Sequence, residues 1–308
     1  VIVAVVDTGI DSDHPEFTDR ILEGYEFTDG AGGERDNDPE DTHGHGTHCA
    51  GTILGSATLG SGGSEGTGIK GIAYDAKLMP VRVLTNRGGT RDNVNQGIMW
   101  AAGLDPDRSS PTYGQPRTPT AEDPARRADV INLSLGGGGF DANTADVLRR
   151  VKEAGVTVLM AAGNNGSGRP GYPASHAYYG HLAERGSGND LLAGAGMAIG
   201  AVDSSRDMAY FSQRASDSAG DFVNAPGHRV YSAVIGGYDT WSGTSMATPH
   251  TTGLAALLSQ YRNPRTSGTD LRDSAGYLYG LGAEGRFTPD QIESIIAYTA
   301  DNSWDATG

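Results

Sequence analysis

The sequence predicts an α/β fold in which a doubly wound, mostly parallel β-sheet carries helices on both faces. Continuous apolar runs at 1–6, 129–135 and 155–163 are typical of strands that are buried on both sides of a parallel sheet. Segments with helical spacing of apolar residues, at 91–102 and 144–155, alternate with these runs. Alternation of this kind is the pattern of a parallel sheet with helices packed on it.

Single residues indicate where two of the helices begin or end. The helix 144–155 is expected to stop at Gly155, because glycine tolerates the backbone conformation that ends helices. The stretch 241–261 predicts the last core helix, because its leucines recur at helical spacing. Pro249 fits only near the start of that helix, where its missing N–H has little cost.

The chain of 308 residues is long enough for one large α/β domain, and we expect a single domain over 1–308. Three stretches rich in glycine, proline or charge interrupt the regular pattern. Core-like segments resume directly after each of them, so we interpret them as surface insertions. They cover 55–68, 103–128 and 262–287.

Composition narrows the classes of partner. The formal net charge is −15, and such a surface would repel phosphate backbones, which argues against a nucleic-acid partner. No apolar run approaches the length of a membrane-spanning helix, so we expect a soluble chain with no membrane partner. The single cysteine, Cys49, excludes intrachain disulfides. Because the chain opens on a strand with no signal peptide, we expect the natural N-terminus upstream.

Four polar residues are expected along one edge of the predicted sheet. Asp7 and Asn164 each follow a strand, whereas His45 and Ser245 each lie at the start of a helix. Ligands of open α/β sheets bind at the carboxyl ends of the strands. Taken singly, a turn aspartate, a turn asparagine and a helix-capping serine are ordinary interpretations. Together the four residues supply the carboxylate, base, hydroxyl nucleophile and oxyanion donor that acyl transfer requires.

Three histidines, His43, His45 and His48, lie close together in "DTHGHGTHCAG". His45 is expected to be a neutral base, because the positive end of a helix dipole disfavours the imidazolium form. Alternatively, the three histidines and a nearby aspartate would form the zinc site of a metalloenzyme. The apolar continuation 49–53 indicates a buried helix and favours the first interpretation.

Five motifs resemble the subtilisin family of serine proteases: "VVDTGID", "HGTHCAGT", "VINLSLGG", "AAGNNG" and "GTSMATPH", with "FTPDQIESIIAYTA" similar to the last helix of that family. The resemblance implies a subtilisin-like fold, serine endopeptidase activity on polypeptides and a triad of Asp7, His45 and Ser245. It also implies an oxyanion hole formed by the Asn164 side chain and the Ser245 N–H. Cys49 resembles the cysteine of the thermitase and proteinase K branch, where it would be a small core residue near His45.

The resemblance further implies how substrates and partners bind. An extended peptide would add as a strand between two backbone walls, with broad sequence tolerance and an apolar preference at P1, the residue on the acyl side of the cleaved bond. We expect a secreted monomer whose cleft also accepts a propeptide or protein inhibitors. An insertion relative to the family falls at 174–195. The walls and primary pocket are expected to contain Gly88, Gly89, Ser134, Leu135, Gly136, Ala161, Ala162 and Gly163.

An acidic stretch just before His45 predicts a structural Ca²⁺ site. Hard oxygen ligands at close spacing suit calcium, which takes six to eight oxygens. The expected ligands are Asp36, Asp38 and Asp41, in a loop that resembles the calcium loop of thermitase-like members of the family. A solvated acidic turn without metal is the alternative.

Two other functions remain compatible with the same fold. A transpeptidase or macrocyclase would transfer the acyl group to an amine instead of water, helped by a cover that slows the access of water. A non-catalytic binding module is disfavoured, because every catalytic position is occupied by the expected residue type.

Overall fold

The computed structural model describes residues 1–28, 38–57, 68–120, 124–166, 168–177, 196–215, 221–261 and 286–300, and the backbone of 271–272 and 278–279. Its central strands are β1 (Ile2–Asp7), β2 (Tyr25–Glu26), β3 (Lys77–Arg82), β4 (Val130–Leu133), β5 (Thr157–Ala161), β6 (Met197–Val202) and β7 (Phe222–Pro226).

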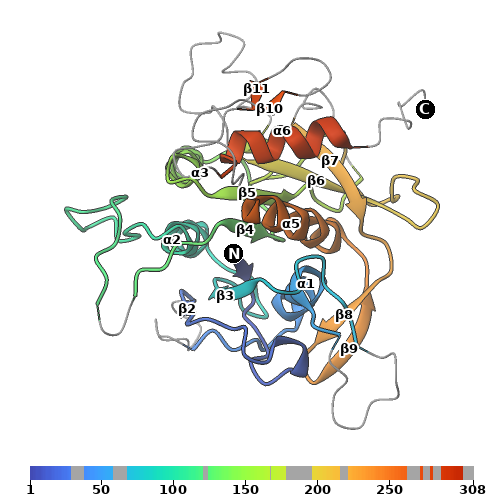
Figure 1. Cartoon of the computed structure of the whole chain (residues 1–308), viewed down its shortest axis with the longest axis horizontal. Helices are drawn as coiled ribbons and strands as arrows, with labels where there is room; N and C mark the ends of the chain where they lie inside the picture. Colours follow the sequence, from blue (N-terminus) through green and yellow to red (C-terminus); the bar gives the residue numbers. More distant parts are fainter. Residues whose placement is uncertain are drawn as a thin grey trace.

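Within the described residues these strands form one sheet of seven strands, in the order β2-β3-β1-β4-β5-β6-β7 (Figure 1). Every neighbouring pair in this sheet is parallel. The predicted doubly wound α/β fold is therefore confirmed.

The strands are apolar on both faces, as their sequence predicts. In β1, Val3 and Val5 belong to one hydrophobic cluster, whereas Ala4 and Val6 belong to the other. Successive side chains of a strand point to opposite faces, so a continuous apolar run supplies both layers of the core.

Helices cover each face of the sheet. Helix α5 runs along β4 to β7 and packs against two other helices of its face, while the two helices of the opposite face pack against each other (Figure 1). The first face carries α1 (His45–Leu54), α5 (Thr244–Gln260) and α6 (Pro289–Thr299), and the opposite face carries α2 (Arg91–Ala101) and α3 (Ala142–Glu153).

Two helix boundaries differ from the sequence prediction. Helix α3 ends at Glu153, and Gly155 follows with a φ of 82°, the left-handed conformation expected after a helix end. Helix α5 begins at Thr244 because the residues before it belong to an antiparallel hairpin of β8 (Val230–Val234) and β9 (Gly237–Trp241). Sequence analysis missed this hairpin. A second small pair joins β10 (Leu271–Arg272) to β11 (Leu278–Tyr279).

The insertion 103–128 connects the end of α2 to the start of β4. The N–H of Ala128 bonds to Ala101 O, and the N–H of Asp129 bonds to Ile2 O at the first residue of β1. This insertion therefore leaves the sheet at the amino ends of its strands. Most of the other predicted insertions, at 55–68, 174–195 and 262–287, lies outside the described residues.

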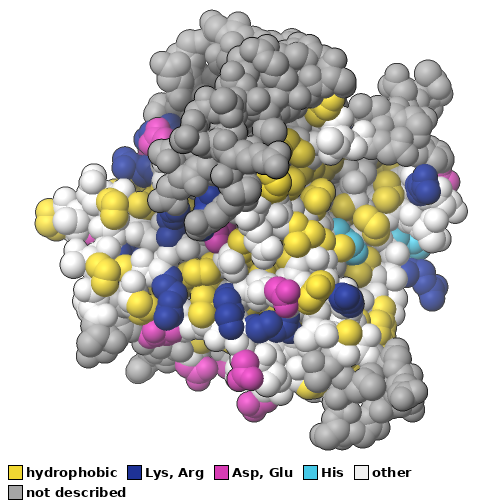
Figure 2. Space-filling view, viewed as in Figure 1, with side chains coloured by type: hydrophobic (Ala, Val, Ile, Leu, Met, Phe, Trp, Pro, Cys, Tyr) yellow, Lys and Arg dark blue, Asp and Glu magenta, His cyan; other side chains and the backbone are white. Residues whose placement is uncertain are grey.

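No described helix is both long and apolar enough to span a bilayer. On the face drawn in Figure 2, basic and acidic side chains are interspersed across the described surface.

Candidate active site

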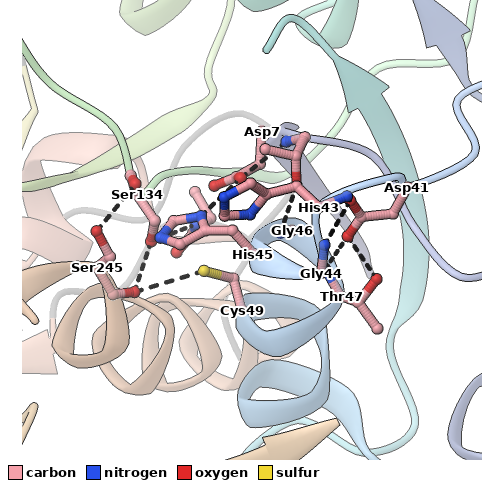
Figure 3. Close-up of polar contacts among 12 residues, drawn as sticks. Asp7, Asp41, His43, Gly44, His45, Gly46, Thr47, Cys49, Ser134 and Ser245 are labelled. Carbon is pink, nitrogen blue, oxygen red and sulfur yellow. Dashed lines mark hydrogen bonds and ion pairs between the residues drawn. The ribbon is translucent and has the colours of Figure 1, made fainter. Parts of the chain in front are cut away.

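The four predicted catalytic residues lie at the carboxyl edge of the sheet. Asp7 is the last residue of β1, and Asn164 follows the end of β5 by three positions. His45 is the first residue of α1 and Ser245 the second of α5, and these two helices pack side by side. Figure 3 shows Asp7, His45 and Ser245 with their neighbours.

A short hydrogen bond joins Asp7 to His45. Oδ1 of Asp7 lies 2.7 Å from Nδ1 of His45, and the aspartate side chain is fully buried whereas the imidazole is 20% exposed. Because a carboxylate only accepts, Nδ1 carries the proton and Nε2 holds the lone pair. The N–H of Thr8 also donates to Oδ1 at 2.8 Å. Oδ2 of Asp7 has no hydrogen-bond partner among the described residues.

The pKa of His45 lies above its ordinary value. Burial lowers this pKa, but the charge of Asp7, its hydrogen bond and the charge of Asp41 together outweigh burial. The sequence prediction of a histidine kept neutral by the helix dipole was therefore wrong in direction. A full carboxylate charge in direct contact exceeds the partial charge of a helix end.

Ser245 is held through both its hydroxyl and its backbone. Its Oγ donates to the Ser134 carbonyl at 3.1 Å, and its own carbonyl accepts from Ser134 Oγ at 2.8 Å. No hydrogen bond between Ser245 Oγ and His45 occurs among the described contacts.

Buried polar groups hold Ser134, the residue that hydrogen-bonds to Ser245. Ser134 Oγ accepts from Asn132 Nδ2 at 2.9 Å, and Asn132 Oδ1 accepts from Thr252 Oγ1 at 2.9 Å. These groups link β4 to the middle of α5. Sequence analysis assigned Ser134 to substrate binding but missed this supporting role and the part of Asn132, whose place in an apolar strand was the available signal.

Asn164 has one end of its amide fixed. Its Oδ1 accepts from the N–H of Thr244 at 2.8 Å and from Thr244 Oγ1 at 3.0 Å. With the oxygen occupied at the start of α5, the Nδ2 donors are directed elsewhere. Asn164 is exposed and lines the cleft together with Ser245. The arrangement is suited to donating a hydrogen bond to a negatively charged oxygen near Ser245.

Cys49 lies under the site as a buried side chain. Its Sγ is 3.5 Å from the Ser245 carbonyl oxygen. Burial raises the pKa of this thiol well above its usual value. A thiol kept protonated in this way is a poor nucleophile, and Cys49 behaves as a small core residue near His45.

The three neighbouring histidines have separate environments. His48 Nε2 lies 3.1 Å from the Val230 carbonyl oxygen, and burial lowers the pKa of His48 to about 4. Trp241 of β9 stacks on the His48 ring with centroids 5.1 Å apart, and its ring is 6.3 Å from that of His45. Among the described residues, the ligand-type atoms that come close enough to share a metal are those of Asp7, His45 and Cys49. The His43, His45 and His48 cluster thus does not assemble as zinc ligands.

A cleft of ≈ 670 Å³ runs past these residues. Its lining includes the predicted wall residues Gly88, Gly89, Ser134, Leu135 and Gly136. The lining does not include the predicted Ala161, Ala162 and Gly163, and both alanines are buried. Lining residues that the sequence did not predict include Leu84, Arg91, Val94, Tyr172, Pro173 and His176.

Asp41, one of the predicted calcium ligands, caps α1. Its Oδ1 accepts from the N–H groups of His43 and Gly44, both at 2.9 Å, and its Oδ2 accepts from Thr47 N at 3.1 Å and Thr47 Oγ1 at 2.7 Å. Burial raises the pKa of Asp41, but these hydrogen bonds prevail and lower it. Each oxygen already accepts two hydrogen bonds from the start of α1, and a metal-binding role of Asp41 stays a prediction. Asp38 is exposed, and Asp36 lies outside the described residues.

Known proteins resemble the chain over almost its whole length. The family model described as the Subtilase family matches residues 1–306. Thermitase from Thermoactinomyces vulgaris is 34% identical over 290 residues, covering 92% of this chain and 85% of that protein. An intracellular serine protease from Paenibacillus polymyxa is 34% identical over 273 residues, which cover 85% of this chain and 68% of that protein. The crystal structure of a cold adapted subtilisin-like serine proteinase matches with a TM-score of 0.65 and 30% identity. The match covers 96% of this chain and 81% of that one.

Proposed function

Because the chain belongs to the subtilase family and is a serine endopeptidase, we propose that it hydrolyses polypeptides with Asp7, His45 and Ser245 as its triad. The observation that carries this assignment is the 2.7 Å contact between Asp7 Oδ1 and His45 Nδ1, at the sheet edge where Ser245 and Asn164 also lie. A hydroxyl nucleophile, a histidine base, a carboxylate that orients it and an oxyanion donor are the groups with which serine proteases hydrolyse peptides.

In the proposed first step Ser245 Oγ forms a bond to the substrate carbonyl carbon, and its proton passes to His45 Nε2. Asp7 stabilises the imidazolium that results. The C–N bond then breaks, and the proton on Nε2 leaves with the amine. A water molecule then attacks the carbonyl carbon of the acyl-enzyme while His45 Nε2 accepts one of its protons. The bond between this carbon and Ser245 Oγ breaks, the proton on Nε2 passes to Oγ, and the acid product departs.

The negative oxygen of the tetrahedral intermediate would accept from Asn164 Nδ2 and from the N–H of Ser245. The first turn of α5 leaves backbone N–H groups without intrahelical partners, which supports the second donor. Donors that are already oriented cost no reorganisation when charge develops.

The substrate would lie as an extended strand between two walls, the loop at 88–89 and the segment 134–136. Main-chain hydrogen bonds read no side chains, so broad sequence tolerance is expected, with an apolar preference at P1. The cleft would also accept a propeptide or a protein inhibitor in the same extended form. The chain is proposed to act as a secreted monomer, although its relatives include both extracellular and intracellular proteases.

A structural calcium ion is proposed near Asp38 and Asp36. Both Asp41 oxygens already accept hydrogen bonds from the start of α1, so most of the six to eight oxygens that calcium takes would come from other groups. The proposal therefore depends on Asp36 and on backbone carbonyls of the same loop, and calcium would take no part in bond cleavage.

A serine-directed phosphonylating reagent tests the triad. The wild-type protein should lose activity with one equivalent bound at Ser245, whereas Ser245→Ala should neither bind the reagent nor hydrolyse casein. Because Ser245 is half-buried at a helix start, the variant should melt as the active-site-blocked wild type does. Residual activity above about a thousandth of the wild-type rate would refute Ser245 as nucleophile. Mass spectrometry of peptide products would reveal ligated or cyclic species if acyl transfer to amines dominates.

A further inference from the structure

The cleft extends beyond the proposed catalytic residues to the place where helices α2 and α3 begin. Its lining includes Arg91, the first residue of α2, and Asp141, the residue that caps α3. These two helices pack against each other. Asn95 lies one turn after Arg91 on the same face of α2 and also lines the cleft. One end of the cleft is therefore formed by the beginnings of two helices.

A segment between β5 and β6 forms the third side of this end of the cleft. Tyr172 and His176 belong to the lining, with ring centroids 5.2 Å apart. Phe140, which directly precedes Asp141, has its ring centroid 5.4 Å from that of His176. The Tyr172 carbonyl also accepts from the N–H of Gly137 at 2.9 Å. These contacts hold the segment 172–176 against the start of α3, and the recess lies between this segment and the two helices.

Two buried polar atoms of the recess have no hydrogen-bond partner among the described residues. They are Oδ1 of Asn95 and Nδ1 of His176, in residues that are 4% and 1% exposed. Nearly all buried polar groups in proteins are hydrogen-bonded, because an unpaired one has lost its hydration without compensation. Since both residues line the cleft, a molecule bound there can supply the missing partners.

The charges around the recess favour a neutral ligand. Burial raises the pKa of Asp141, but hydrogen bonds from Thr144 and the start of α3 and the charge of Arg91 lower it. Burial lowers the pKa of His176 to about 4, although the charge of Asp141 acts in the opposite direction, so this ring is neutral near pH 7. The ionic side chains described in the lining, Arg91 and Asp141, thus have opposite signs and offset each other.

We propose that this recess binds a carboxamide side chain, glutamine or asparagine, of the polypeptide substrate. The inference rests on the proposed function, because it names a substrate preference of the same cleft. A carboxamide has two donors and an acceptor in one neutral group, and a neutral imidazole has one donor and one acceptor nitrogen. The ligand can therefore donate to Asn95 Oδ1 and also hydrogen-bond to the His176 ring. An apolar side chain would leave both atoms unpaired, and an ionic one would lose its hydration without a counter-charge that is free.

The test is cleavage of internally quenched peptides that carry glutamine, methionine or glutamate at one position and are otherwise identical. That position is moved from five residues before the cleaved bond to two residues after it, and a second series compares asparagine with leucine and aspartate. Methionine matches the length of glutamine without its amide, and glutamate matches its shape but adds a charge. At one position kcat/KM should be at least about tenfold higher for the carboxamide than for either of its two counterparts.

Variants of the recess should remove this preference. Asn95→Leu replaces the amide by an apolar group of similar size, and it should bring the carboxamide-to-apolar ratio at that position to within about threefold of one. His176→Phe removes both ring nitrogens and should lower the ratio as well. The matched control is Asn93→Leu, because Asn93 is also buried on α2 but lies outside the lining of the cleft. This control should leave the ratio unchanged.

The proposal is overturned if the wild type favours the carboxamide at none of these positions, or if the preference survives Asn95→Leu. Where Asn95→Leu does not fold, the same outcome in His176→Phe overturns it. An equal loss of preference in Asn93→Leu would also contradict it, because the effect would then belong to α2 as a whole. Active enzyme is counted by phosphonylation of Ser245 in every variant. A wild-type protein that is not phosphonylated and cleaves none of the peptides would instead contradict the proposed function.

Discussion

The two helices that carry proposed catalytic residues begin differently from the three described helices that do not. Helices α2, α3 and α6 each start with a side chain that caps its own helix, from Thr90, Asp141 and Thr288. Helices α1 and α5 instead have Gly44 and Gly243 at the capping position, where no side chain is present. The catalytic helices depend on other segments to satisfy their first N–H groups.

Those caps come from Asp41 for α1 and from Asn164 for α5. Asp41 precedes its helix by only a few residues, whereas Asn164 lies 80 positions from Thr244 in the sequence. The comparison indicates that each helix carrying a proposed catalytic residue is capped by a side chain from outside its own capping position.

The largest effect should come from Asn164, which caps α5 and is proposed to donate to the oxyanion. Asn164→Ala should lower kcat by roughly 10²–10³-fold with little change in KM, because the oxyanion exists only after attack. It should also destabilise the fold by about 1 kcal/mol through loss of the cap. Asn164→Asp keeps an oxygen for Thr244 but loses the donor. Steady-state kinetics, with urea denaturation in the Ser245→Ala background, would therefore show kcat lost but stability largely retained.

An Asn164→Ala effect confined to KM would contradict the oxyanion role. An unchanged urea midpoint in the same variant would contradict the capping role.

The next effect is the pH dependence set by His45 at the start of α1. Burial lowers its pKa, but the charge and hydrogen bond of Asp7 together with the charge of Asp41 outweigh burial and raise it. The base is active only when neutral, so kcat/KM should fall about tenfold per pH unit below this pKa. The midpoint should lie above the ordinary histidine value of about 6.5. A midpoint below that value would contradict the dominance of Asp7.

Cys49→Ala provides the control for this profile. The pKa of its thiol is raised by burial, so the thiol stays neutral over the same range. Removal of the thiol should therefore leave unchanged the fall of kcat/KM at low pH.

Calcium should support the segment before α1. An ion that binds only the folded state adds roughly 2.7 kcal/mol at a hundredfold excess over Kd. Melting of Ser245→Ala protein in millimolar calcium and in excess EGTA measures this difference without self-digestion. Equal melting temperatures would remove the case for a stabilising ion. If calcium still raises the melting temperature of the Asp36→Ala/Asp38→Ala variant, the ion binds at another place in the protein.

Removing a single helix cap should change stability and activity less. It should also distinguish helices that carry a proposed catalytic residue from helices that do not. Asp41→Ala and Thr288→Ala should each cost about 1–2 kcal/mol of unfolding free energy. Only Asp41→Ala should also lower kcat/KM, since α1 carries His45. Because the pKa of Asp41 is lowered in the folded protein, its advantage over Asp41→Ala should shrink as pH falls through that pKa. If Asp41→Ala and Thr288→Ala lower kcat/KM equally, the cap of α1 has no special link to activity.

The smallest effect is expected from the insertion 103–128. It leaves the sheet at the amino ends of the strands, opposite the catalytic edge. Shortening it should leave kcat/KM for small peptides nearly unchanged. A tenfold loss with an unchanged melting temperature would show that this insertion contributes to the cleft.

Much of the fold could be predicted because its signals are local. Apolar runs such as 1–6 need only their own composition to indicate burial on both faces. The motifs around Asp7, His45 and Ser245 indicated the chemistry because each places one reactive group directly beside a strand end or a helix start. The hairpin of β8 and β9 was missed, because most of its residues are polar or at least partly exposed and its sequence lacks clear alternation.

The sequence by itself thus determined the sheet, the residue types at its carboxyl edge and their chain order. Only the tertiary structure decided which carboxylates accept hydrogen bonds from a helix start, how the Asn164 amide is oriented and what Gln213 packs against. Asp41 is occupied by α1, Asn164 is oriented by Thr244, and Gln213 lies beside glycines that are distant in sequence. The physical reason is that hydrogen bonding and close packing depend on distances in space, which residue spacing along the chain does not specify once several segments have to meet.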